Sequence, residues 1–412
     1  MTENGAVREI HVGSSHNTSE ALRHAQIQAA ERGLYDFVVI DADAHHYEGE
    51  VWSEIKNYIE DPLIRYEAKG GGPETEVAEG VPLMVGSWGN QFLSGRIPRM
   101  QLRRQEAADL AGAERDALII ERTMEAMAID YQIVFPTPML SLGLHPEQRI
   151  ETAIARAYSR WVCERILPHH PGIKTMLYLP FNDPAASLRL VEDFAGIDGV
   201  VGFVVTGVRY TQVSDNAYAS LYSAIEERGQ PLAFHGGYRW GAGGDRSFES
   251  LNRFISVHAI GFPLSLMLHV ANWVINGLPE RYPSLRTLWI EGGLAWIPFL
   301  MQRLDHEYLM RTSEAPLLKR LPSEYMRDLF YTSQPLERTD DEALELTFRM
   351  INANTQLLYS SDYPHWDFDT PARIYDLPFL NEQSKRNILG SNAARLFGLP
   401  STPRLSAPAV RA

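Results

Sequence analysis

At residues 38–48 the chain reads Val-Val-Ile-Asp-Ala-Asp-Ala-His-His-Tyr-Glu, a short apolar run that passes directly into a dense group of ionisable residues. The apolar, partly β-branched start is typical of a strand buried on both faces. Burying several carboxylates at the end of such a strand is costly unless a cation or hydrogen bonds offset the lost hydration. Residues two apart on a strand share a face, so Asp43 and His45 can bind one ion while Asp41 and Ala44 face elsewhere. The segment therefore favours a metal site over a solvated acidic loop.

Similar apolar runs recur along the chain, and from residue 113 onward each one follows a stretch with helical periodicity. Eight buried strands that alternate with helices are typical of a parallel barrel more than of a doubly wound sheet. We therefore predict an α/β fold, a (β/α)₈ TIM-like barrel with a long insertion after strand 1. With the polar residues that end them, the seven later runs cover residues 130–136, 173–180, 200–205, 231–237, 285–293, 329–333 and 357–362.

The barrel is predicted to span residues 36–399. A helical extension, residues 1–35, precedes it, and a flexible tail, residues 400–412, follows it. The insertion covers residues 49–112. Long irregular segments inside a domain are usually lids or interface elements. Because this one directly follows a strand with candidate catalytic residues, we expect it to cover the site.

Composition excludes several classes of protein. The formal net charge of −14 argues against nucleic acid and against an anionic membrane as partners. The longest apolar stretch, residues 262–275, is interrupted by polar residues and is too short to span a bilayer. The start of the chain lacks the basic and apolar regions of a secretory signal. Cys163 is the only cysteine, so no intramolecular disulfide can form, and a cytoplasmic location is expected.

Ionisable residues stand at the ends of four predicted strands. In a parallel barrel the carboxyl ends of all strands meet at one rim, where such proteins build their sites. These residues are therefore expected to converge, and two of them are followed by Gly-Gly, which allows the backbone to approach a ligand closely. They are Asp43 and His45 on strand one, His235 on strand five, Glu291 on strand six and Asp362 on strand eight.

With these segments the chain resembles the amidohydrolase superfamily and, within it, the amidohydrolase-related (amidohydrolase 2) family. That family includes decarboxylases of aminocarboxymuconate semialdehyde and of hydroxybenzoates. The likeness runs from about residue 36 to 399. It rests on Asp41-Ala-Asp-Ala-His45, Phe234-His-Gly-Gly237, Glu291-Gly-Gly-Leu-Ala-Trp-Ile-Pro298 with Arg303-Leu-Asp305, Ser361-Asp-Tyr-Pro-His365, and residues 387–397.

The resemblance implies a mononuclear metal site with a His-x-His pair on strand one, a His on strand five and an Asp on strand eight. By position, the metal ligands become Asp43, His45, His235 and Asp362. Asp43 departs from the family pattern because it replaces the first His. Glu291 departs too, because it stands where strand six usually offers a His that binds metal or acts as an acid or base.

Both departures replace nitrogen by anionic oxygen. More carboxylate favours Mn²⁺, Fe²⁺ or Mg²⁺ relative to a nitrogen-rich zinc site. We therefore expect a divalent metal (Zn, Mn or Fe), as one ion or as two. Glu48 and His365 could complete a site for two ions, like that of the small branch of the superfamily that hydroxylates with two Fe or Mn ions. For Glu48, a salt bridge within the insertion is an equal alternative.

Two arginines are candidates for binding the substrate. Arg209 and Arg239 lie near the ends of strands four and five, where a guanidinium group can bind a carboxylate through two hydrogen bonds. Thr206 and Arg209 also stand at the end of strand four, where the dinuclear hydrolases carry a carbamylated lysine that bridges two metal ions. A bridging lysine is therefore not expected here. His258 and His269 are expected on one side of a long helix, in the core or at a subunit interface.

Three chemistries fit this residue set. The first is hydrolysis of a small organic acid or amide by a metal-activated water, with Asp362 moving the proton and His365 or Glu291 polarising the substrate. The second is oxygenation at two Fe or Mn ions, which needs an electron-transfer partner. Non-oxidative decarboxylation ranks third, because strand six lacks its His. A homo- or hetero-oligomer is expected in each case, and a non-catalytic subunit is a further alternative.

Overall fold

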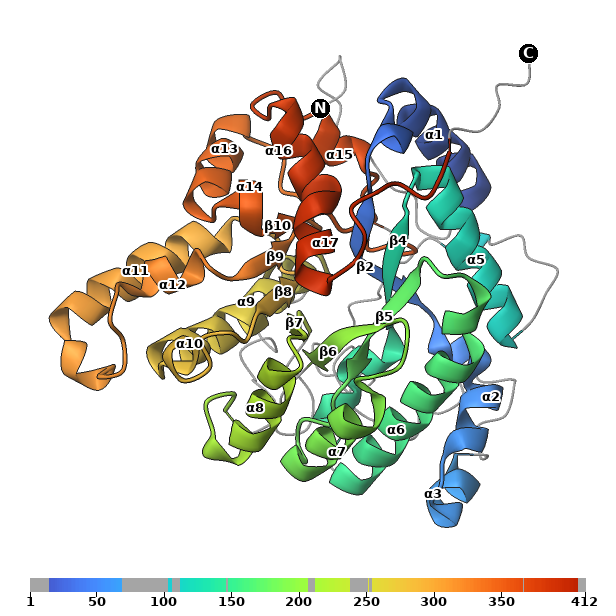
Figure 1. The fold of residues 1–412 in the computed structure, drawn as a ribbon, viewed down its shortest axis with the longest axis horizontal. Helices are drawn as coiled ribbons and strands as arrows, with labels where there is room; N and C mark the ends of the chain where they lie inside the picture. The colour runs from blue at the N-terminus through green and yellow to red at the C-terminus, as the bar shows by residue number, and fades with distance from the viewer. Residues whose placement is uncertain are drawn as a thin grey trace.

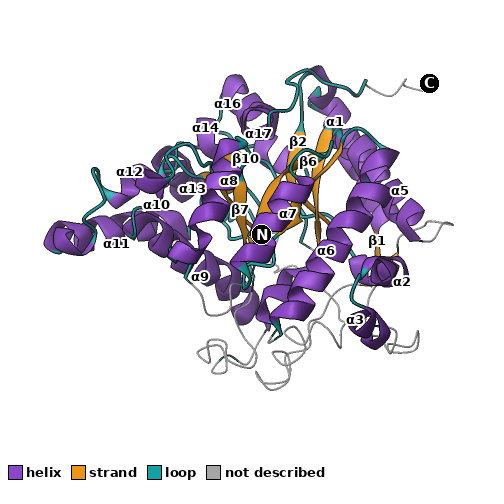
Figure 2. Cartoon of the chain, turned by 60° about the horizontal axis from the view of Figure 1, so that its bottom comes forward, coloured by secondary structure: helices purple, strands orange, loops and turns teal. Residues whose placement is uncertain are grey.

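Eight parallel strands form one sheet at the centre of the protein, in the order β10-β9-β8-β7-β6-β5-β4-β2 (Figures 1 and 2). Each strand overlaps one of the apolar runs, and the predicted (β/α)₈ barrel is confirmed. The computed structural model describes residues 15–68, 103–105, 112–145, 147–206, 212–237, 251, 254–365 and 367–406. The strands are β2 (Ile40–His46), β4 (Tyr131–Pro136), β5 (Ile173–Tyr178), β6 (Val200–Thr206), β7 (Leu232–His235), β8 (Thr287–Ile290), β9 (Phe330–Thr332) and β10 (Leu357–Leu358).

Backbone hydrogen bonds join the first strand of the barrel to the segment that follows the last. The amide of Ala42 donates to the carbonyl of Tyr359 over 2.9 Å, and the amide of Asp362 donates to the carbonyl of Asp43 over 2.8 Å. A third bond, from the amide of His45 to the carbonyl of Tyr363, measures 2.7 Å. These bonds close the barrel between β2 and β10, and we call this line of contact the seam.

Helices surround the strands (Figure 2). Several begin at capping side chains that the sequence places before them: Asp183 accepts from the amide of Ala186, and Asp340 accepts from the amide of Ala343. The longer helices are α1 (Thr18–Glu31), α5 (Gly112–Met127), α6 (Gln148–Arg165), α7 (Pro184–Phe194), α8 (Ala219–Glu227), α9 (Phe254–Ile275), α11 (Trp296–Met310) and α13 (Asp341–Met350). The shorter ones are α2 (Trp52–Ile55), α3 (Pro62–Glu67), α10 (Leu278–Arg281), α12 (Pro322–Met326), α14 (Ala353–Gln356), α15 (Ala372–Tyr375), α16 (Glu382–Arg386) and α17 (Asn392–Phe397).

A π-helical turn, Asn387–Ser391, lies between α16 and α17 and packs on the start of the first barrel strand. Gly390 sits so close to Val38 that a Cβ atom would overlap the Val38 carbonyl. The absence of a side chain at Gly390 therefore lets the C-terminal helices pack against β2.

The described part of the predicted insertion is helical over residues 49–67 and also contains one short strand, β3 (Arg103–Gln105). It contains the 3₁₀ turn Glu48–Val51, α2, the 3₁₀ turn Lys56–Tyr58 and α3, and it packs against α6 through buried residues such as Trp52. A separate two-stranded parallel ladder pairs β1 (Ser15–Asn17) with β3 (Arg103–Gln105). Residues 69–102 and 106–111 lie outside the described residues, so the predicted lid remains an expectation.

The first residues of the predicted C-terminal tail are anchored. The backbone amides of Arg404 and Leu405 both donate to Asp130, which directly precedes β4. The guanidinium group of Arg404 lies 5.2 Å from the ring centre of Tyr131. The chain is therefore fixed to the barrel as far as these residues.

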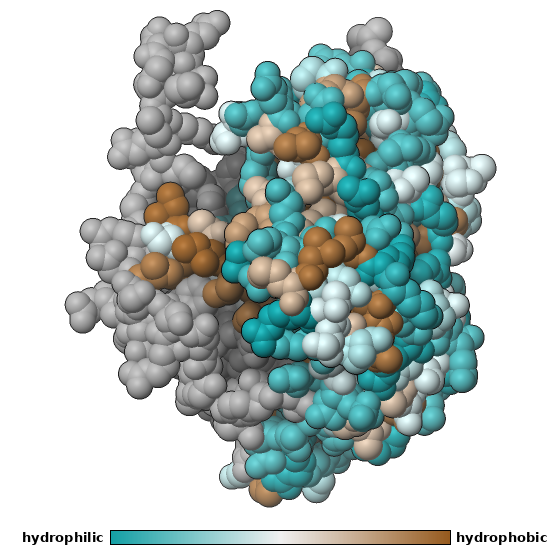
Figure 3. Space-filling view, turned by 90° about the vertical axis from the view of Figure 1, so that its left-hand side faces the viewer, coloured by the Kyte–Doolittle hydropathy of each residue, from teal (hydrophilic) through white to brown (hydrophobic). Residues whose placement is uncertain are grey.

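Helix α9 connects β7 to β8 and is longer than the apolar stretch noted in the sequence. By length and composition alone its residues Ile255–Ile275 could cross a membrane. The helix packs against β7, α10, α11 and α12, which identifies it as a helix of the barrel wall. Its burial is mixed: Val257, Leu266 and Val270 are buried, and Ile255, Ile260 and Leu268 are exposed. The side of the molecule that contains α9 to α12, at the left of Figure 1, faces the viewer in Figure 3, where apolar residues are scattered among polar ones.

Candidate metal centre

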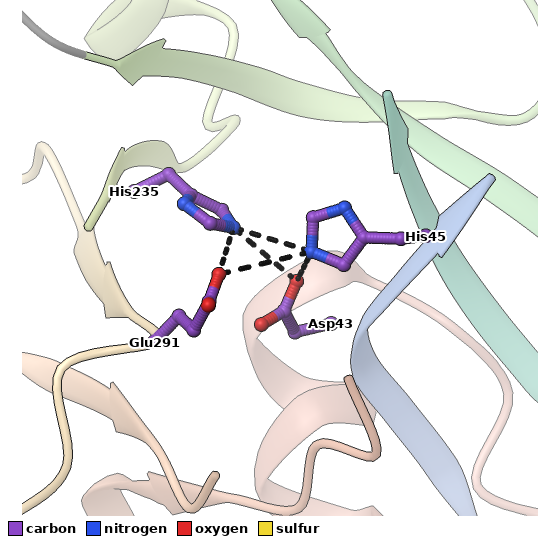
Figure 4. Close-up of side chains that lie close together, drawn as sticks. All are labelled: Asp43, His45, His235 and Glu291. Carbon is purple, nitrogen blue, oxygen red and sulfur yellow. Dashed lines mark hydrogen bonds and ion pairs between the residues drawn. The ribbon is translucent and has the colours of Figure 1, made fainter. Parts of the chain in front are cut away.

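Four ionisable side chains converge at the carboxyl ends of β2, β7 and β8 (Figure 4). They are Asp43, His45, His235 and Glu291; all four are buried, and one ligand atom from each lies within 4.8 Å of the others. The Nε2 atom of His235 is 3.1 Å from Oε2 of Glu291 and 3.4 Å from Nε2 of His45. The Nε2 atom of His45 is 3.3 Å from Oδ1 of Asp43. The structure thus brings together residues from three predicted strands.

Asp362 and His365 form a second group that overlaps the first. The Oδ1 atom of Asp362 is 3.3 Å from Nε2 of His45 and 2.6 Å from Nδ1 of His365. The His365 ring stacks on the His45 ring with 4.4 Å between their centres. Its Nε2 atom lies 3.2 Å from the hydroxyl of Thr137, at the end of β4. Asp362 therefore connects His45 to a second, buried imidazole.

Glu291 and Asp362 are both held in the left-handed region of backbone conformation, with φ values of 55° and 58°. Such residues cost free energy and persist where the surroundings fix them, commonly at functional sites. The amide of Glu291 donates to the hydroxyl of Thr332 over 3.1 Å, and the amide of Asp362 is bonded across the seam. The backbone is thus fixed in a strained form where the two carboxylates turn into the barrel.

The carboxylates of the cluster differ in their electrostatic surroundings. Burial alone would raise the pKa of Asp43, but the neighbouring imidazoles of His45 and His235 hold the pKa well below its usual range. Burial raises the pKa of Asp362 well above its usual range, and the charge of Asp43 adds to the effect. Within the described residues no hydrogen bond satisfies either buried oxygen of Asp43. Such an arrangement is unfavourable unless a cation compensates the charge.

The donor set fits one divalent cation. The Nδ1 atom of His235 is 2.7 Å from the carbonyl of Gly236, and donation to that carbonyl would leave Nε2 free to bind an ion. His45 approaches Asp43, Glu291 and Asp362 through the same Nε2 atom. Because one nitrogen lone pair binds one ion, the two overlapping groups describe alternatives around a single position. The mixture of imidazole and carboxylate suits Mn²⁺ or Fe²⁺ as well as Zn²⁺.

Asp41 lies behind the cluster and accepts four hydrogen bonds. Its Oδ1 atom accepts from the amides of Ser361, at 2.8 Å, and Asp43, at 3.2 Å. Its Oδ2 atom accepts from the Ser361 hydroxyl at 2.5 Å and from Gln132 Nε2 at 2.9 Å. Burial raises the pKa of Asp41 to about 7 despite these bonds. Sequence reasoning did not assign this role, although Gln132, a polar residue in an apolar strand, was a signal for a buried partner.

Glu48 is buried but is not brought into the cluster. Its two carboxylate oxygens accept from the backbone amides of Met139, at 2.5 Å, and Thr137, at 2.8 Å, in the turn that follows β4. Burial raises the pKa of Glu48 to about 7. Among the described residues Glu48 thus orders the loop next to Thr137 and is not part of the cluster, and a salt bridge to the undescribed part of the insertion remains a prediction.

His46 points away from His45 and forms a separate buried group. Its Nε2 atom lies 2.8 Å from the hydroxyl of Tyr158, and its Nδ1 atom lies 3.1 Å from Asp116. The ring also stacks on Trp161, 5.7 Å away. These partners belong to α5 and α6, so they attach the end of β2 to the helical layer.

The remaining candidates lie away from the cluster or outside the described residues. Arg209 and Arg239 lie outside them, so their role in substrate binding remains a prediction. His269 lies against Phe234 in the core, with 6.0 Å between ring centres, and His258 is 3.8 Å from Asp367. Burial raises the pKa of Cys163 to about 12, which fits its interpretation as a packing residue.

Comparisons with known proteins identify related sequences and folds. Residues 40–399 match the sequence profile of the family described as amidohydrolase. A gamma-resorcylate decarboxylase of Polaromonas sp. is 22% identical over 282 residues, which are 64% of this chain and 83% of that protein.

Solved structures share the fold at low identity. The 5-carboxyvanillate decarboxylase of Sphingomonas paucimobilis has a TM-score of 0.64 and 20% identity, and the alignment covers 88% of this chain and 99% of that one. A dihydroxybenzoic acid decarboxylase of Polaromonas sp., solved with manganese and 2-nitroresorcinol, has a TM-score of 0.58 and 15% identity, covering 88% and 96% of the two chains.

Proposed function

The chain belongs to the amidohydrolase family, and from that premise we propose that it is a divalent-metal-dependent decarboxylase of a small hydroxylated aromatic acid. The observation that carries the proposal is the buried cluster of Asp43, His45, His235 and Glu291 at the carboxyl ends of the strands. Its position and its donor atoms suit a metal centre that receives a small acid from the rim of the barrel.

The comparisons favour decarboxylation over the two chemistries that the sequence ranked first. Gamma-resorcylate decarboxylases are among the relatives that match the sequence, and decarboxylases of 5-carboxyvanillate and of dihydroxybenzoic acid share the fold. The sequence ranked this chemistry third because strand six has Glu291 in place of a His. The structure places Glu291 3.1 Å from Nε2 of His235, so a carboxylate occupies the position beside the strand-five ligand.

Non-oxidative decarboxylation requires only a proton from the protein. The proton forms a C–H bond at the ring carbon, the C–C bond to the carboxylate breaks, and its electron pair restores the aromatic ring as carbon dioxide leaves. Atoms and electrons balance without an oxidant, so no electron-transfer partner is needed. Hydroxylation of the same substrate would require dioxygen and two further electrons.

The protein's own residues supply binding and proton transfer. Asp43, His45, His235 and Glu291 would hold the metal, with Asp362 as a further ligand. When bound, a Mn²⁺-type ion supplies Lewis acidity that orients the substrate carboxylate and an adjacent hydroxyl. The carboxyl of Asp362, 2.6 Å from Nδ1 of His365, is the group we propose to deliver the proton, and His365 orients it. Thr137 in turn positions His365 through its hydroxyl.

The test is an assay of manganese-loaded protein against hydroxybenzoates, including 2,6-dihydroxybenzoate and 5-carboxyvanillate. We expect carbon dioxide and the matching phenol in equal amounts, without oxygen consumption, and one metal ion per chain. His235→Ala should lose the metal and the activity while remaining folded, and His24→Ala, on the surface of α1, should keep both. Hydrolysis of amides or lactones without carbon dioxide release, or oxygen consumption with a hydroxylated product, would overturn the proposal.

A further inference from the structure

The hydroxyl group of Thr206 lies at the rim of the barrel beside the candidate metal centre. Thr206 is the last residue of β6 and pairs with His235, the last residue of β7, so both side chains lie on the same face of the sheet. His235 points into the barrel, towards Glu291 (Figure 4). Because neighbouring strands are about 4.8 Å apart, Thr206 faces the space next to a candidate metal ligand.

The Thr206 side chain is buried, but no hydrogen bond within the described residues satisfies its hydroxyl oxygen. Buried polar groups in native proteins are nearly always paired, so an exception needs a partner that the chain itself does not supply. The two carboxylate oxygens of Asp43 are in the same condition, and a bound cation explains them. A hydroxyl contributes no charge to offset a cation, so the oxygen of Thr206 suits a polar group of the substrate better than the ion.

The side chains behind Thr206 determine the direction in which its hydrogen bond runs. The carboxylate of Glu151 on α6 accepts from the hydroxyl of Tyr178 over 2.9 Å and from Nδ2 of Asn182 over 3.0 Å. Asn182 also donates to the carbonyl of Gly143 over 2.7 Å, which fixes the orientation of its amide because a carbonyl can only accept. Both oxygens of Glu151 therefore have a donor, and the single proton of the Tyr178 hydroxyl is committed to Glu151.

Tyr178 can therefore offer Thr206 only an acceptor. It shares the inward face of the sheet, because it pairs with Val204, two residues before Thr206. Burial and the charge of Glu151 raise the pKa of Tyr178 well above its usual range, so the phenol keeps its proton. The nearby hydroxyl of Thr206 acts on that pKa in the opposite direction, as a donor does. A threonine that donates its one hydrogen to Tyr178 can only accept from a group inside the barrel.

We propose that Thr206 determines specificity by accepting a hydrogen bond from a ring hydroxyl of the substrate, and that Tyr178 and Glu151 are positioning residues that set this polarity. The inference rests on the proposed function and concerns a hydroxyl other than the one next to the metal. Such a hydroxyl completes a chain in which the substrate donates to Thr206, Thr206 to Tyr178, and Tyr178 to Glu151. A methoxy group at the same ring position has no hydrogen to donate, so its oxygen would face the lone pairs of Thr206. The site should therefore select a hydroxyl over a methoxy group.

The first experiment compares 2,6-dihydroxybenzoate with 2-hydroxy-6-methoxybenzoate, which lacks one hydrogen-bond donor. The manganese-loaded protein is assayed well above the pKa of Glu151, which burial raises to about 7, so that this carboxylate can only accept. For the wild type, kcat/KM should favour the dihydroxy acid by about 10-fold or more, because the ether leaves a buried acceptor unpaired.

Thr206→Val should reduce this preference to about twofold or less, because it removes the acceptor, whereas Thr206→Ser should keep it. Valine has nearly the shape of threonine, so a preference caused only by the size of the methoxy group would persist in Thr206→Val. The matched control is Thr175→Val, which removes a buried hydroxyl that donates to the carbonyl of Val134 over 2.8 Å and should keep the full preference. A wild type without the preference, or a Thr206→Val variant that retains it, would refute the proposal.

A second variant, Tyr178→Phe, tests the polarity of the chain. Without the phenol oxygen the hydroxyl of Thr206 can turn and donate, so kcat/KM for the methoxy acid should rise relative to the wild type. Thr206→Val narrows the same difference from the other side, by lowering kcat/KM for the dihydroxy acid. If Tyr178 had only a structural role, its loss would lower kcat/KM for both acids alike, and that result would exclude the chain.

The two proposals can fail separately. If the wild type releases carbon dioxide from neither acid, the proposed function is wrong, and the same comparison is made with dissociation constants from calorimetric titration of the manganese-loaded protein. Tighter binding of the dihydroxy acid that disappears in Thr206→Val would then still support the role of Thr206. Equal binding of the two acids to the wild type would refute it.

Discussion

Asp41 lies outside the cluster, and its hydrogen bonds fix the backbone next to two candidate ligands, Asp43 and Asp362. It accepts from the amide of Asp43 and from both donors of Ser361, the residue before Asp362. Burying a carboxylate without a cation costs free energy, and the four hydrogen bonds that Asp41 accepts reduce that cost. Its role is therefore to position ligands from both sides of the seam.

We expect Asp41→Ala to weaken manganese binding by about 10- to 100-fold, the usual effect of removing a residue that orients metal ligands. Asp41→Asn should weaken manganese binding less, because the Asn side chain retains an oxygen that can accept from the two backbone amides. Calorimetric titration of the metal-free protein measures both affinities. Glu151→Ala removes another buried carboxylate, on α6, and should leave the affinity unchanged. Equal affinities in wild type and Asp41→Ala would contradict the positioning role.

Glu151 provides a test of pH dependence away from the metal centre. Burial raises its pKa from 4.5 to about 7, although the Tyr178 hydroxyl and Asn182 donate to it; the nearby charge of Asp183 raises it slightly further. The folded protein thus holds a proton that the unfolded chain releases between pH 4.5 and 7. The stability from that proton is complete below pH 4.5 and is lost as the pH rises through 7.

Glu151→Gln should therefore flatten this part of the stability curve. At about 1.4 kcal/mol per unit of pKa, the wild type should lose up to about 3 kcal/mol more than the variant between pH 4.5 and 8. Urea unfolding of both metal-free proteins at several pH values measures the difference. Parallel curves would show that Glu151 does not titrate in this range.

At the scale of elements, the sequence predicts where the strands lie, but it does not predict the irregularity within β2. Long apolar runs separated by amphipathic stretches identify buried parallel strands, and each run overlaps an observed strand. For β2 the spacing argument was wrong, because strict alternation puts Asp41 on the same face as Asp43 and His45, so it does not predict that Asp41 faces elsewhere. The pairing of β2 with β4 shifts between Asp41 and Ala44, and this irregularity goes with the different surroundings of the two aspartates.

The candidate site was predictable where residues end strands and unpredictable where loops supply partners. Asp43, His45, His235, Glu291 and Asp362 all follow apolar runs, so topology alone brought them together. Thr137 and Ser361 carry no such signal, because a hydroxyl after a strand is common and its partner is set by tertiary packing. For the same reason, the sequence does not predict the backbone amides that donate to Glu48. Only the folded chain shows which backbone donors face a buried carboxylate.

Gly390 gives a prediction for the contact between the π-helical turn and β2. Its missing side chain makes room for the Val38 carbonyl, so Gly390→Ala should force the two elements apart. We expect a loss of about 1–3 kcal/mol or more in the free energy of unfolding. In Gly196→Ala, where a Cβ would meet no atom within 4 Å, the change should stay within about 0.5 kcal/mol. Denaturant unfolding compares the two, and equal effects would exclude the steric explanation.

At the scale of the whole molecule, the metal should contribute to stability. An ion that binds only the folded chain stabilises it by about 2.7 kcal/mol at a concentration 100 times its Kd. We expect chelation to lower the melting temperature by several degrees and manganese to restore it. His235→Ala should show no such response to manganese, because it lacks a central ligand. A chelated wild type that melts at the same temperature as the manganese-loaded protein would be evidence against a metal centre here.

The seam sets an order of events during synthesis. Asp41 and Ser361 are 320 residues apart, yet they meet at the point where Asp43, His45 and Asp362 come together. A chain emerging from the ribosome exposes its first ligands long before the last one has been made. Until β10 reaches β2, the early ligands remain an incomplete set with lower affinity. We therefore expect tight metal binding to come late, after the two ends of the barrel have joined.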